Sequence, residues 1–335
     1  MSQTRKHRDL EVSSNLSPLP AWLVPFACLL TTGALIGLST NLAKLAAGVG
    51  LEPLAYTAWS VVGAAAVLTA VSAARRKLPP LNARTAEYFV VSGLVSVAAP
   101  NLIFFAAAPR IGAGFVALSI AFPPLFTYLG ALLLGMERFR ARRAAGVALA
   151  LAGAALLAFF KLSEPDASAF WVILTLSTPV ILAFGNLYRT ARWPEGSSPD
   201  ELAPGMLAAS GLMLLLVGAA AGVTPQTPDG FSLTVPTERA APVLLILGQV
   251  AAFSVQYLLF FILQERGGPV YLSLLGSVAA VVGVPVAVFL LGEAVPQGLA
   301  VGGVLITLGV SLLTFGSPEA GQPEQVSSRE TKTAK

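Results

Sequence analysis

Ten apolar stretches of about 20 residues divide the chain, and each has the length that a helix needs to cross the hydrocarbon core of a bilayer. They lie near residues 21–45, 53–74, 86–108, 112–135, 141–160, 168–190, 201–221, 240–264, 268–292 and 297–316. Hydrophobic residues make up 55% of the chain and charged residues only 11%, against about 25% charged in soluble domains. The sequence therefore predicts an all-α integral membrane protein with ten transmembrane helices.

The distribution of basic residues tests this count independently, because Lys and Arg concentrate in cytoplasmic loops. With both termini cytoplasmic, 17 of the 21 Lys and Arg residues fall on the cytoplasmic side. The four exceptions are Lys44, Arg110, Lys161 and Arg239. A missed or invented helix would scramble this alternation, so the pattern predicts ten helices with both ends inside.

An internal repeat relates the two halves of the chain at an offset of 156 residues. The segment from Phe104 to Leu157 contains Phe104-Phe105, Arg110, Gly112, Glu137, Gly146, Gly153 and Leu156-Leu157, which recur as Phe260-Phe261, Arg266, Gly268, Glu293, Gly302, Gly309 and Leu312-Leu313. Because five spans separate the copies, the second copy is inverted in the bilayer. Two inverted five-helix repeats are an architecture of alternating-access carriers.

The repeat extends to the first helix of each half. Asn41-Leu42-Ala43-Lys44 closes the first span and Asn186-Leu187-Tyr188-Arg189 closes the sixth, at an offset of 145 residues. We therefore divide the chain into a first repeat at 21–161 and a second at 162–316. We expect residues 1–20 to form a polar cytoplasmic tail and residues 317–335 a disordered cytoplasmic tail.

The chain resembles the EamA branch of the drug/metabolite transporter (DMT) superfamily from about Trp22 to Phe315. The residues that carry the resemblance are Ile111-Gly112-Ala113-Gly114, Pro123-Pro124-Leu125 and Leu134-Gly135-Met136-Glu137-Arg138, with Gly267-Gly268-Pro269-Val270-Tyr271 and Leu291-Gly292-Glu293 in the second half. The resemblance implies a ten-helix carrier with a central cavity between its halves. Members of this branch often export amino acids, related metabolites or drugs, so it does not imply one substrate.

The first helix departs from the small four-helix multidrug relatives in the same superfamily. Those proteins couple transport to protons through a carboxylate in the middle of this helix, where the present chain has Thr31-Thr32-Gly33-Ala34. We therefore do not expect proton coupling by that device.

Polar side chains within the apolar stretches are the candidates for a substrate site, because they cost free energy in hydrocarbon unless they are paired or face a cavity. Gln249 and Gln256 share one helix face with Phe253. Lys44 lies one turn inside the first helix, where it could meet an anionic group of a substrate. The alternative is that the amides join helices by hydrogen bonds and that the charged groups reach the membrane surface. The candidate substrate-binding residues are Gln249, Gln256, Asn101, Ser96, Phe253, Tyr257, Lys44, Asn41 and Tyr128.

Proline and glycine in the spans have two interpretations as well. Proline removes a backbone donor and allows a helix to bend, either for gating or as a packing kink. The candidate gating or kink residues are Pro100, Pro123, Pro124, Pro179 and Pro285. The small residues of the fifth and tenth spans indicate close helix packing and are equally suited to a homodimer surface.

Several classes of function are disfavoured by composition. Cys28 is the single cysteine and His7 the single histidine, so we expect no metal site and no cofactor. The spans contain neither paired midplane carboxylates nor a nucleophile beside a base, which argues against an intramembrane enzyme. The basic residues orient the chain in the membrane, so nucleic acid is not expected as a partner.

These features together predict a multi-pass carrier of the plasma membrane, which in bacteria is the inner membrane. We expect it to translocate small organic metabolites, amino acids being the favoured class and export the favoured direction. Its partners would be the small-molecule substrate and the lipid bilayer. The alternatives are a flippase for lipid-linked sugars or lipids and, more remotely, an intramembrane enzyme.

The predicted topology can be checked by chemical labelling. A cysteine introduced at Thr227 should react with an impermeant reagent added outside the cell, because the loop after the seventh span is predicted to be external. A cysteine at Ser197 should not react, because its loop is predicted to be cytoplasmic. The reverse labelling pattern would contradict the orientation.

Overall fold

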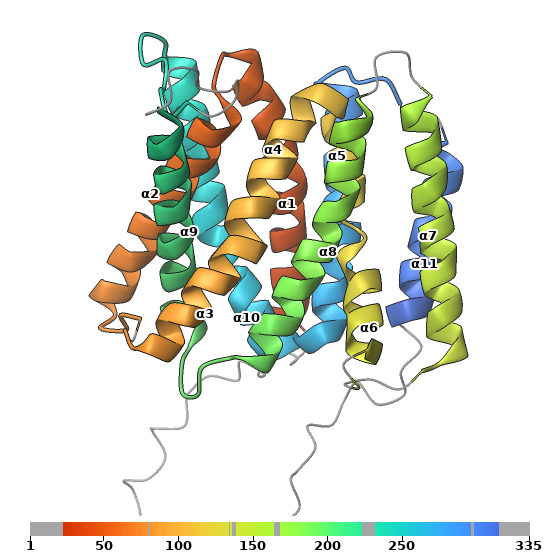
Figure 1. Cartoon of the computed structure of the whole chain (residues 1–335), viewed down its shortest axis with the longest axis horizontal. Coiled ribbons are helices and arrows are strands. Elements are labelled where there is room, and N and C mark those ends of the chain that lie inside the picture. The colour runs from red at the N-terminus through yellow and green to blue at the C-terminus, as the bar shows by residue number, and fades with distance from the viewer. Residues whose placement is uncertain are drawn as a thin grey trace, which may run out of the picture.

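A computed structural model describes residues 23–79, 81–133, 135, 139–163, 168–222, 232–295 and 298–314, with only the backbone described at 267–271, 273, 313 and 314. These residues form a bundle of helices joined by turns and short loops, with no strand among them (Figure 1). The predicted tails at 1–20 and 317–335, the labelling position Thr227 and the repeat residue Glu137 lie outside the described residues.

The order of elements follows the apolar stretches closely. They are α1 (Leu23–Gly48), α2 (Pro53–Ala74), α3 (Ala83–Gly93), η1 (Leu94–Ala98), α4 (Ala99–Ile111), α5 (Ala113–Ser119), α6 (Pro123–Leu133), α7 (Ala141–Leu162), α8 (Ala169–Ala191), α9 (Pro199–Gly222), α10 (Ala240–Pro285), η2 (Val286–Leu290) and α11 (Leu299–Thr314). The two segments labelled η are single turns of π-helix.

Local sequence signals account for some of the helix starts. Pro53 begins α2, where a missing amide hydrogen costs nothing because the first turn has no partner for it. Asn82 and Thr85 cap the start of α3 reciprocally, since each side chain bonds the backbone amide of the other.

Within the described residues, eight helical stretches are long and apolar enough to cross a membrane. Two shorter apolar helices, Leu274–Leu290 and Leu299–Leu312, follow them in the chain. The structure is thus that of an all-helical multi-pass membrane protein. The count of ten spans and the inverted relation of the two halves stay predictions.

The long element α10 turns back on itself. Gln249 donates a hydrogen bond to Ser39 of α1, and Asn41 of α1 donates one to the carbonyl of Gly283. A straight helix would separate residues 249 and 283 by about 51 Å, yet both lie beside the same turn of α1. The first arm of α10, which contains Gln249, therefore runs antiparallel to its second arm, which contains Gly283. α1 packs against both arms.

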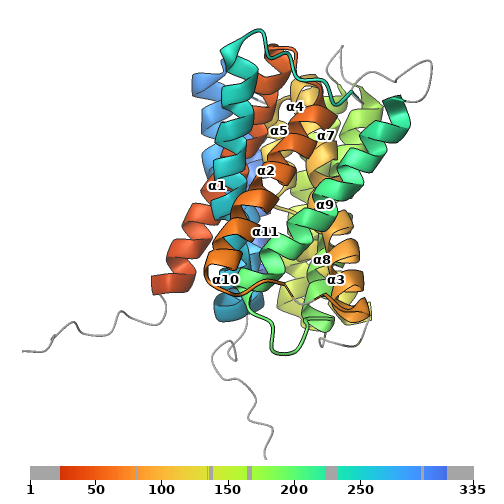
Figure 2. The ribbon, with the colours of Figure 1, turned by 90° about the vertical axis from the view of Figure 1, so that its left-hand side faces the viewer.

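The remaining helices pair across the two halves of the chain. Gly211 of α9 lies against Val62 of α2, while Ser72 near the end of α2 bonds the carbonyl of Asp200 at the start of α9. α2 and α9 are therefore antiparallel neighbours, and they lie at one edge of the bundle (Figures 1 and 2).

α7 and α11 form a similar pair at the opposite edge (Figure 1). Gly153 of α7 approaches Gly302 of α11, and Gly309 approaches Gly146. The glycines of these helices are thus used for packing within the chain. Whether their outer faces also form a homodimer stays a prediction.

Two of the spans are irregular in the middle, and both irregularities adjoin proline. Pro100 cannot donate a hydrogen bond back along its helix, and the chain widens into the π-turn η1 just before it. The predicted fourth span at 112–135 is broken, since α5 ends at Ser119 and α6 begins at Pro123. Pro179, by contrast, lies within the continuous helix α8, and Pro285 ends α10 where η2 begins.

The contact between α1 and the second arm of α10 depends on glycine in α1. A Cβ atom on Gly37 would lie 2.3 Å from the carbonyl oxygen of Ala279, and one on Gly33 would lie 2.5 Å from Cβ of Val278. Backbone atoms cannot move aside as a flexible side chain can. Gly37 therefore allows the backbones of α1 and α10 to approach closely.

Replacing Gly37 with alanine should destabilise the protein by about 1–3 kcal/mol, because overpacking forces the two backbones apart. Gly48→Ala is the matched control, since a Cβ atom on Gly48 would meet nothing within 4 Å. Thermal unfolding can be followed with a thiol-reactive dye, because Cys28 is buried in the folded protein. Equal unfolding temperatures for the two variants would show that the contact is not tight.

Candidate functional site

A cavity of about 380 Å³ lies between the two halves of the chain. The first half contributes residues from α1, from the η1–α4 segment, from the interrupted α5–α6 span and from the start of α7, and the second half contributes residues from α8, α9 and both arms of α10. The polar side chains of its wall are Ser39, Thr40, Ser96, Asn101, Thr127, Tyr128, Arg143, Asn186, Arg189, Thr190, Gln256 and Tyr257. The apolar side chains include Ile36, Phe104, Phe105, Leu182, Phe260 and Leu275.

The structure brings together eight of the residues that the sequence singled out. Those that line the cavity are Ser96, Asn101, Tyr128, Gln256 and Tyr257, with Pro100, Pro123 and Pro124. Those that do not line it are Asn41, Lys44, Gln249 and Phe253, with Pro179 and Pro285. The first set can meet a solute in this conformation, whereas the second set does not line the cavity.

The two glutamines of α10 differ in their environment although they share one face of the sequence pattern. Gln249 is completely buried, accepts a hydrogen bond from the Tyr56 hydroxyl at 2.9 Å and donates one to the Ser39 hydroxyl at 2.8 Å. Gln256 is also buried, but its Oε1 atom has no hydrogen-bond partner. Gln249 therefore joins three helices, as the helix-joining interpretation expects, whereas Gln256 is a residue of the cavity lining with an unused acceptor.

An aromatic wall lies beside Gln256. Asn101 donates a hydrogen bond of 2.8 Å to the Tyr257 hydroxyl, which fixes the positions of both side chains. Phe253 is completely buried behind this wall, where its ring stacks on Phe105 and meets the edge of Tyr257. Phe253 thus supports the lining instead of forming it, because two aromatic residues stand between its ring and the cavity.

Arg189, which was counted among the basic residues of the cytoplasmic side, was missed as a site residue. The structure places it in the last turn of α8 with only 2% of its surface exposed. Its guanidinium donates to Ser96, to Asn186 at 2.7 Å and to Gln264 at 3.4 Å. The guanidinium also lies over the ring of Phe260, 4.9 Å from the ring centroid. The internal repeat could have indicated Arg189 as a candidate, because Arg189 corresponds in the repeat to Lys44, which was one.

A second arginine of the lining, Arg143, lies at the start of α7 with its guanidinium 5.5 Å from the centroid of the Tyr128 ring. Tyr128 in turn accepts a hydrogen bond from the backbone amide of Arg140. Among the residues that the structure describes, the cavity wall therefore carries two cationic side chains and no Asp or Glu.

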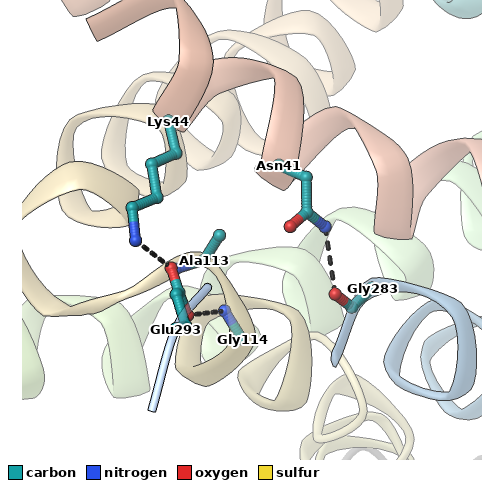
Figure 3. A network of polar contacts seen from close by, with 6 residues as sticks. All are labelled: Asn41, Lys44, Ala113, Gly114, Gly283 and Glu293. Carbon is teal, nitrogen blue, oxygen red and sulfur yellow. Dashed lines mark hydrogen bonds and ion pairs between the residues drawn. The ribbon is translucent and has the colours of Figure 1, made fainter. Parts of the chain in front are cut away.

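At the other end of the bundle a polar cluster joins the two halves, and we call it the Lys44–Glu293 latch (Figure 3). The Glu293 carboxylate pairs with Lys44 of α1 and accepts hydrogen bonds from the amides of Ala113 at 2.7 Å and Gly114 at 3.1 Å. Nearby, Asn41 donates to the carbonyl of Gly283 at 3.0 Å. Lys44 was predicted to meet a substrate, but in this conformation its partner is a carboxylate of the chain itself.

The latch and Arg189 lie far apart along the axis of α8. Gly112 lies beside the Glu293 carboxylate of the latch. Arg110, two residues earlier in the chain, lies over Trp171 at the start of α8, so the latch is near that end of α8. Since Arg189 follows Trp171 by 18 residues of one helix, the two ends are separated by about 27 Å. Polar contacts thus join the helices at one end of the bundle, and the cavity lining extends to Arg143 and Arg189 toward the other.

The hydrogen bonds of the latch favour the ionised form of Glu293. Burial by itself would raise the pKa of its carboxyl group, but the bonds from Lys44, Gly114 and Ala113 outweigh burial and bring the pKa below its ordinary value of 4.5. A carboxyl group of this kind stabilises the folded contact above its ordinary pKa and loses that contribution as the pH falls through the lowered value. The latch should therefore hold at neutral pH and weaken only in acid.

Fold and cavity together define a multi-pass helical membrane protein with a solute-sized site between its halves. Residues 24–159 match the EamA-like transporter family. That family is part of the drug/metabolite transporter superfamily, and its members are membrane transporters.

Comparison with other proteins adds information on the fold alone. No curated protein matches the chain. A solved structure, titled only as the crystal structure of a protein, matches with a TM-score of 0.55 and 22% identity over 88% of this chain and 97% of its own. The arrangement of helices is therefore one that experiment has seen in another chain of similar length.

Breaking the latch should expose the cavity from the Lys44–Glu293 end. In a Cys28→Ala, Thr40→Cys background, Glu293→Gln should raise the rate of labelling from that side roughly tenfold, the effect of losing about 1.4 kcal/mol of closure. Lys44→Gln should act in the same way, and the double variant should add little, because both changes remove one interaction. Acidification below about pH 4.5 should reproduce the effect in the unchanged latch.

The control is Arg75→Gln, which removes a different ion pair, that with Asp200. It should leave the labelling rate unchanged. If Glu293→Gln and Arg75→Gln behaved alike, the Lys44–Glu293 contact would not be what closes this end.

Proposed function

We propose that this protein is an alternating-access carrier that moves a small organic metabolite across the plasma membrane. The favoured substrate class is amino acids and the favoured direction is export. The observation that carries the proposal is the cavity of about 380 Å³ between the two halves, with the unused acceptor of Gln256 in its wall. Buried polar atoms without a partner are rare in folded proteins, and a ligand is a natural partner for one in a cavity.

The asymmetry between the two ends supports an alternating mechanism. The Lys44–Glu293 latch and the close contact at Gly37 bring α1 against the second arm of α10 at one end. The cavity lining extends to Arg143 and Arg189 toward the other end. On the predicted topology the hollow end faces the cytoplasm, so this conformation is suited to loading a substrate for export.

The irregular segments give such a carrier the means to change shape. Non-helical backbone within a membrane is tolerated where it lines a cavity, and the break between Ser119 and Pro123 lies in the cavity wall. The π-turn η1 carries Ser96, another residue of the wall. We infer that these two segments are the hinges of the first repeat.

Substrate binding can be tested at Gln256. A thermal-shift screen of the purified protein against amino acids and related metabolites identifies a ligand, because a compound that binds the folded state raises its melting temperature. Gln256→Leu should then weaken binding of that ligand by about 1–3 kcal/mol, since a polar group loses its partner while it stays desolvated. Counterflow in proteoliposomes tests whether the bound compound is also carried.

Gln249→Leu is the matched control on the same helix face. It should lower the melting temperature, because Tyr56 and Ser39 lose a partner, and it should leave the affinity unchanged. Unchanged affinity in Gln256→Leu would remove Gln256 from the site, and a ligand that binds but shows no counterflow would argue against a carrier.

A further inference from the structure

Arg189 is a buried cation with only neutral partners. Its nitrogen atoms donate to the hydroxyl of Ser96 and to the side-chain carbonyls of Asn186 and Gln264, and Phe260 covers one face of the guanidinium. Within the part of the chain that the structure describes, no carboxylate oxygen lies within 4.0 Å of it. The ion pairs found there are Lys44–Glu293, Arg75–Asp200 and Lys77–Asp200.

A charge in this position is costly for the protein alone. Removing an ion from water costs several kcal/mol unless an opposite charge or a full set of hydrogen bonds compensates it. Hydrogen bonds to neutral oxygens compensate less than those to a carboxylate, which are shorter and roughly twice as strong. An anion that entered the cavity would therefore gain more from Arg189 than its present partners do.

The rest of the wall limits what such an anion can be. Phe104, Phe105 and Phe260 offer aromatic surface, and Ile36 and Leu275 offer aliphatic surface. The Oε1 atom of Gln256, one turn before Phe260 on the same arm of α10, needs a hydrogen-bond donor. A molecule with an oxyanion, a donor group and an apolar body would satisfy all three parts of the wall.

We propose that Arg189 binds the anionic group of the carried substrate, and that the substrates are small organic anions or zwitterions with an apolar body. This rests on the proposed carrier function. The oxyanion replaces Ser96 or Asn186 as a partner of the guanidinium, and an ammonium or hydroxyl group of the substrate donates to Gln256. Amino acids with apolar side chains fit this description, as do simple aryl and alkyl carboxylates.

The test compares carboxylic acids with their amides, which have nearly the same shape and no charge. The panel is acetate, isovalerate, 3-phenylpropionate and L-phenylalanine, each with its primary amide, and binding to the purified full-length protein is measured by calorimetry at pH 7. At least one acid should bind ten- to a hundredfold more tightly than its amide. Arg189→Gln should abolish that preference, and Arg189→Lys should retain a reduced one, because lysine keeps the charge without the planar fork.

Arg110→Gln is the matched control. Arg110 is an exposed arginine of α4 that lies over Trp171, at the end of α8 opposite to Arg189. It should leave the acid preference intact. If no acid in the panel bound more tightly than its amide, or if folded Arg189→Gln kept the preference, the proposal would be overturned. Should Arg189→Gln not fold, the same comparison on Arg189→Lys decides, since an unreduced preference there contradicts a role for the guanidinium.

The proteoliposome assay separates this inference from the carrier proposal. Counterflow of a neutral amide with no acid preference would support the carrier and overturn the anion site. Acid binding that depends on Arg189, without counterflow, would support the anion site and overturn the carrier.

Discussion

Everything in this structure depends on the need to satisfy backbone hydrogen bonds where no water is available. Regular helices meet that need by themselves, and most of the described residues lie in helices. Among the described residues, the gap between Ser119 and Pro123 and the π-turn at Leu94–Ala98 depart from regular helix and contribute residues to the cavity wall, whereas the π-turn at Val286–Leu290 does not. Two of the irregular segments thus lie where a solute or water can reach them, which is where the proposed carrier would need to bend.

The polar and packing interactions differ between the two ends of the bundle. One end is held by glycine contacts, which bring α1 and α10 together without a specific partner, and by the Lys44–Glu293 latch, which is specific and partly buried (Figure 3). The other end carries Arg189 with neutral partners in place of a carboxylate. Because Lys44 and Arg189 occupy corresponding positions in the predicted repeat, the same element of sequence contributes an ion pair at one end and a cation of the cavity lining at the other.

Stability and function place different requirements on the polar residues of the interior. Gln249 has both of its side-chain groups paired and stabilises the contact of α1, α2 and α10. Gln256 and Arg189 are also buried, but their interactions are incomplete. Among the described residues, Gln256 lacks a hydrogen-bond donor for its Oε1 atom, and Arg189 lacks an anionic partner. Such unmatched polar groups lower the stability of the protein without substrate. A substrate that supplies the missing hydrogen-bond donor and the missing anion lowers the free energy of the substrate-bound protein.

The sequence by itself determined the helices, their approximate limits and the membrane environment, because apolar length and the distribution of charge are local properties. It also indicated Gln256, Asn101 and Tyr257, since polar residues in an apolar stretch stand out. Only the tertiary structure decided that Gln249 joins helices, that Lys44 pairs with Glu293 and that Arg189 faces the cavity. The reason is that two side chains with the same helical phase or the same repeat position differ only in what the neighbouring helices place against them.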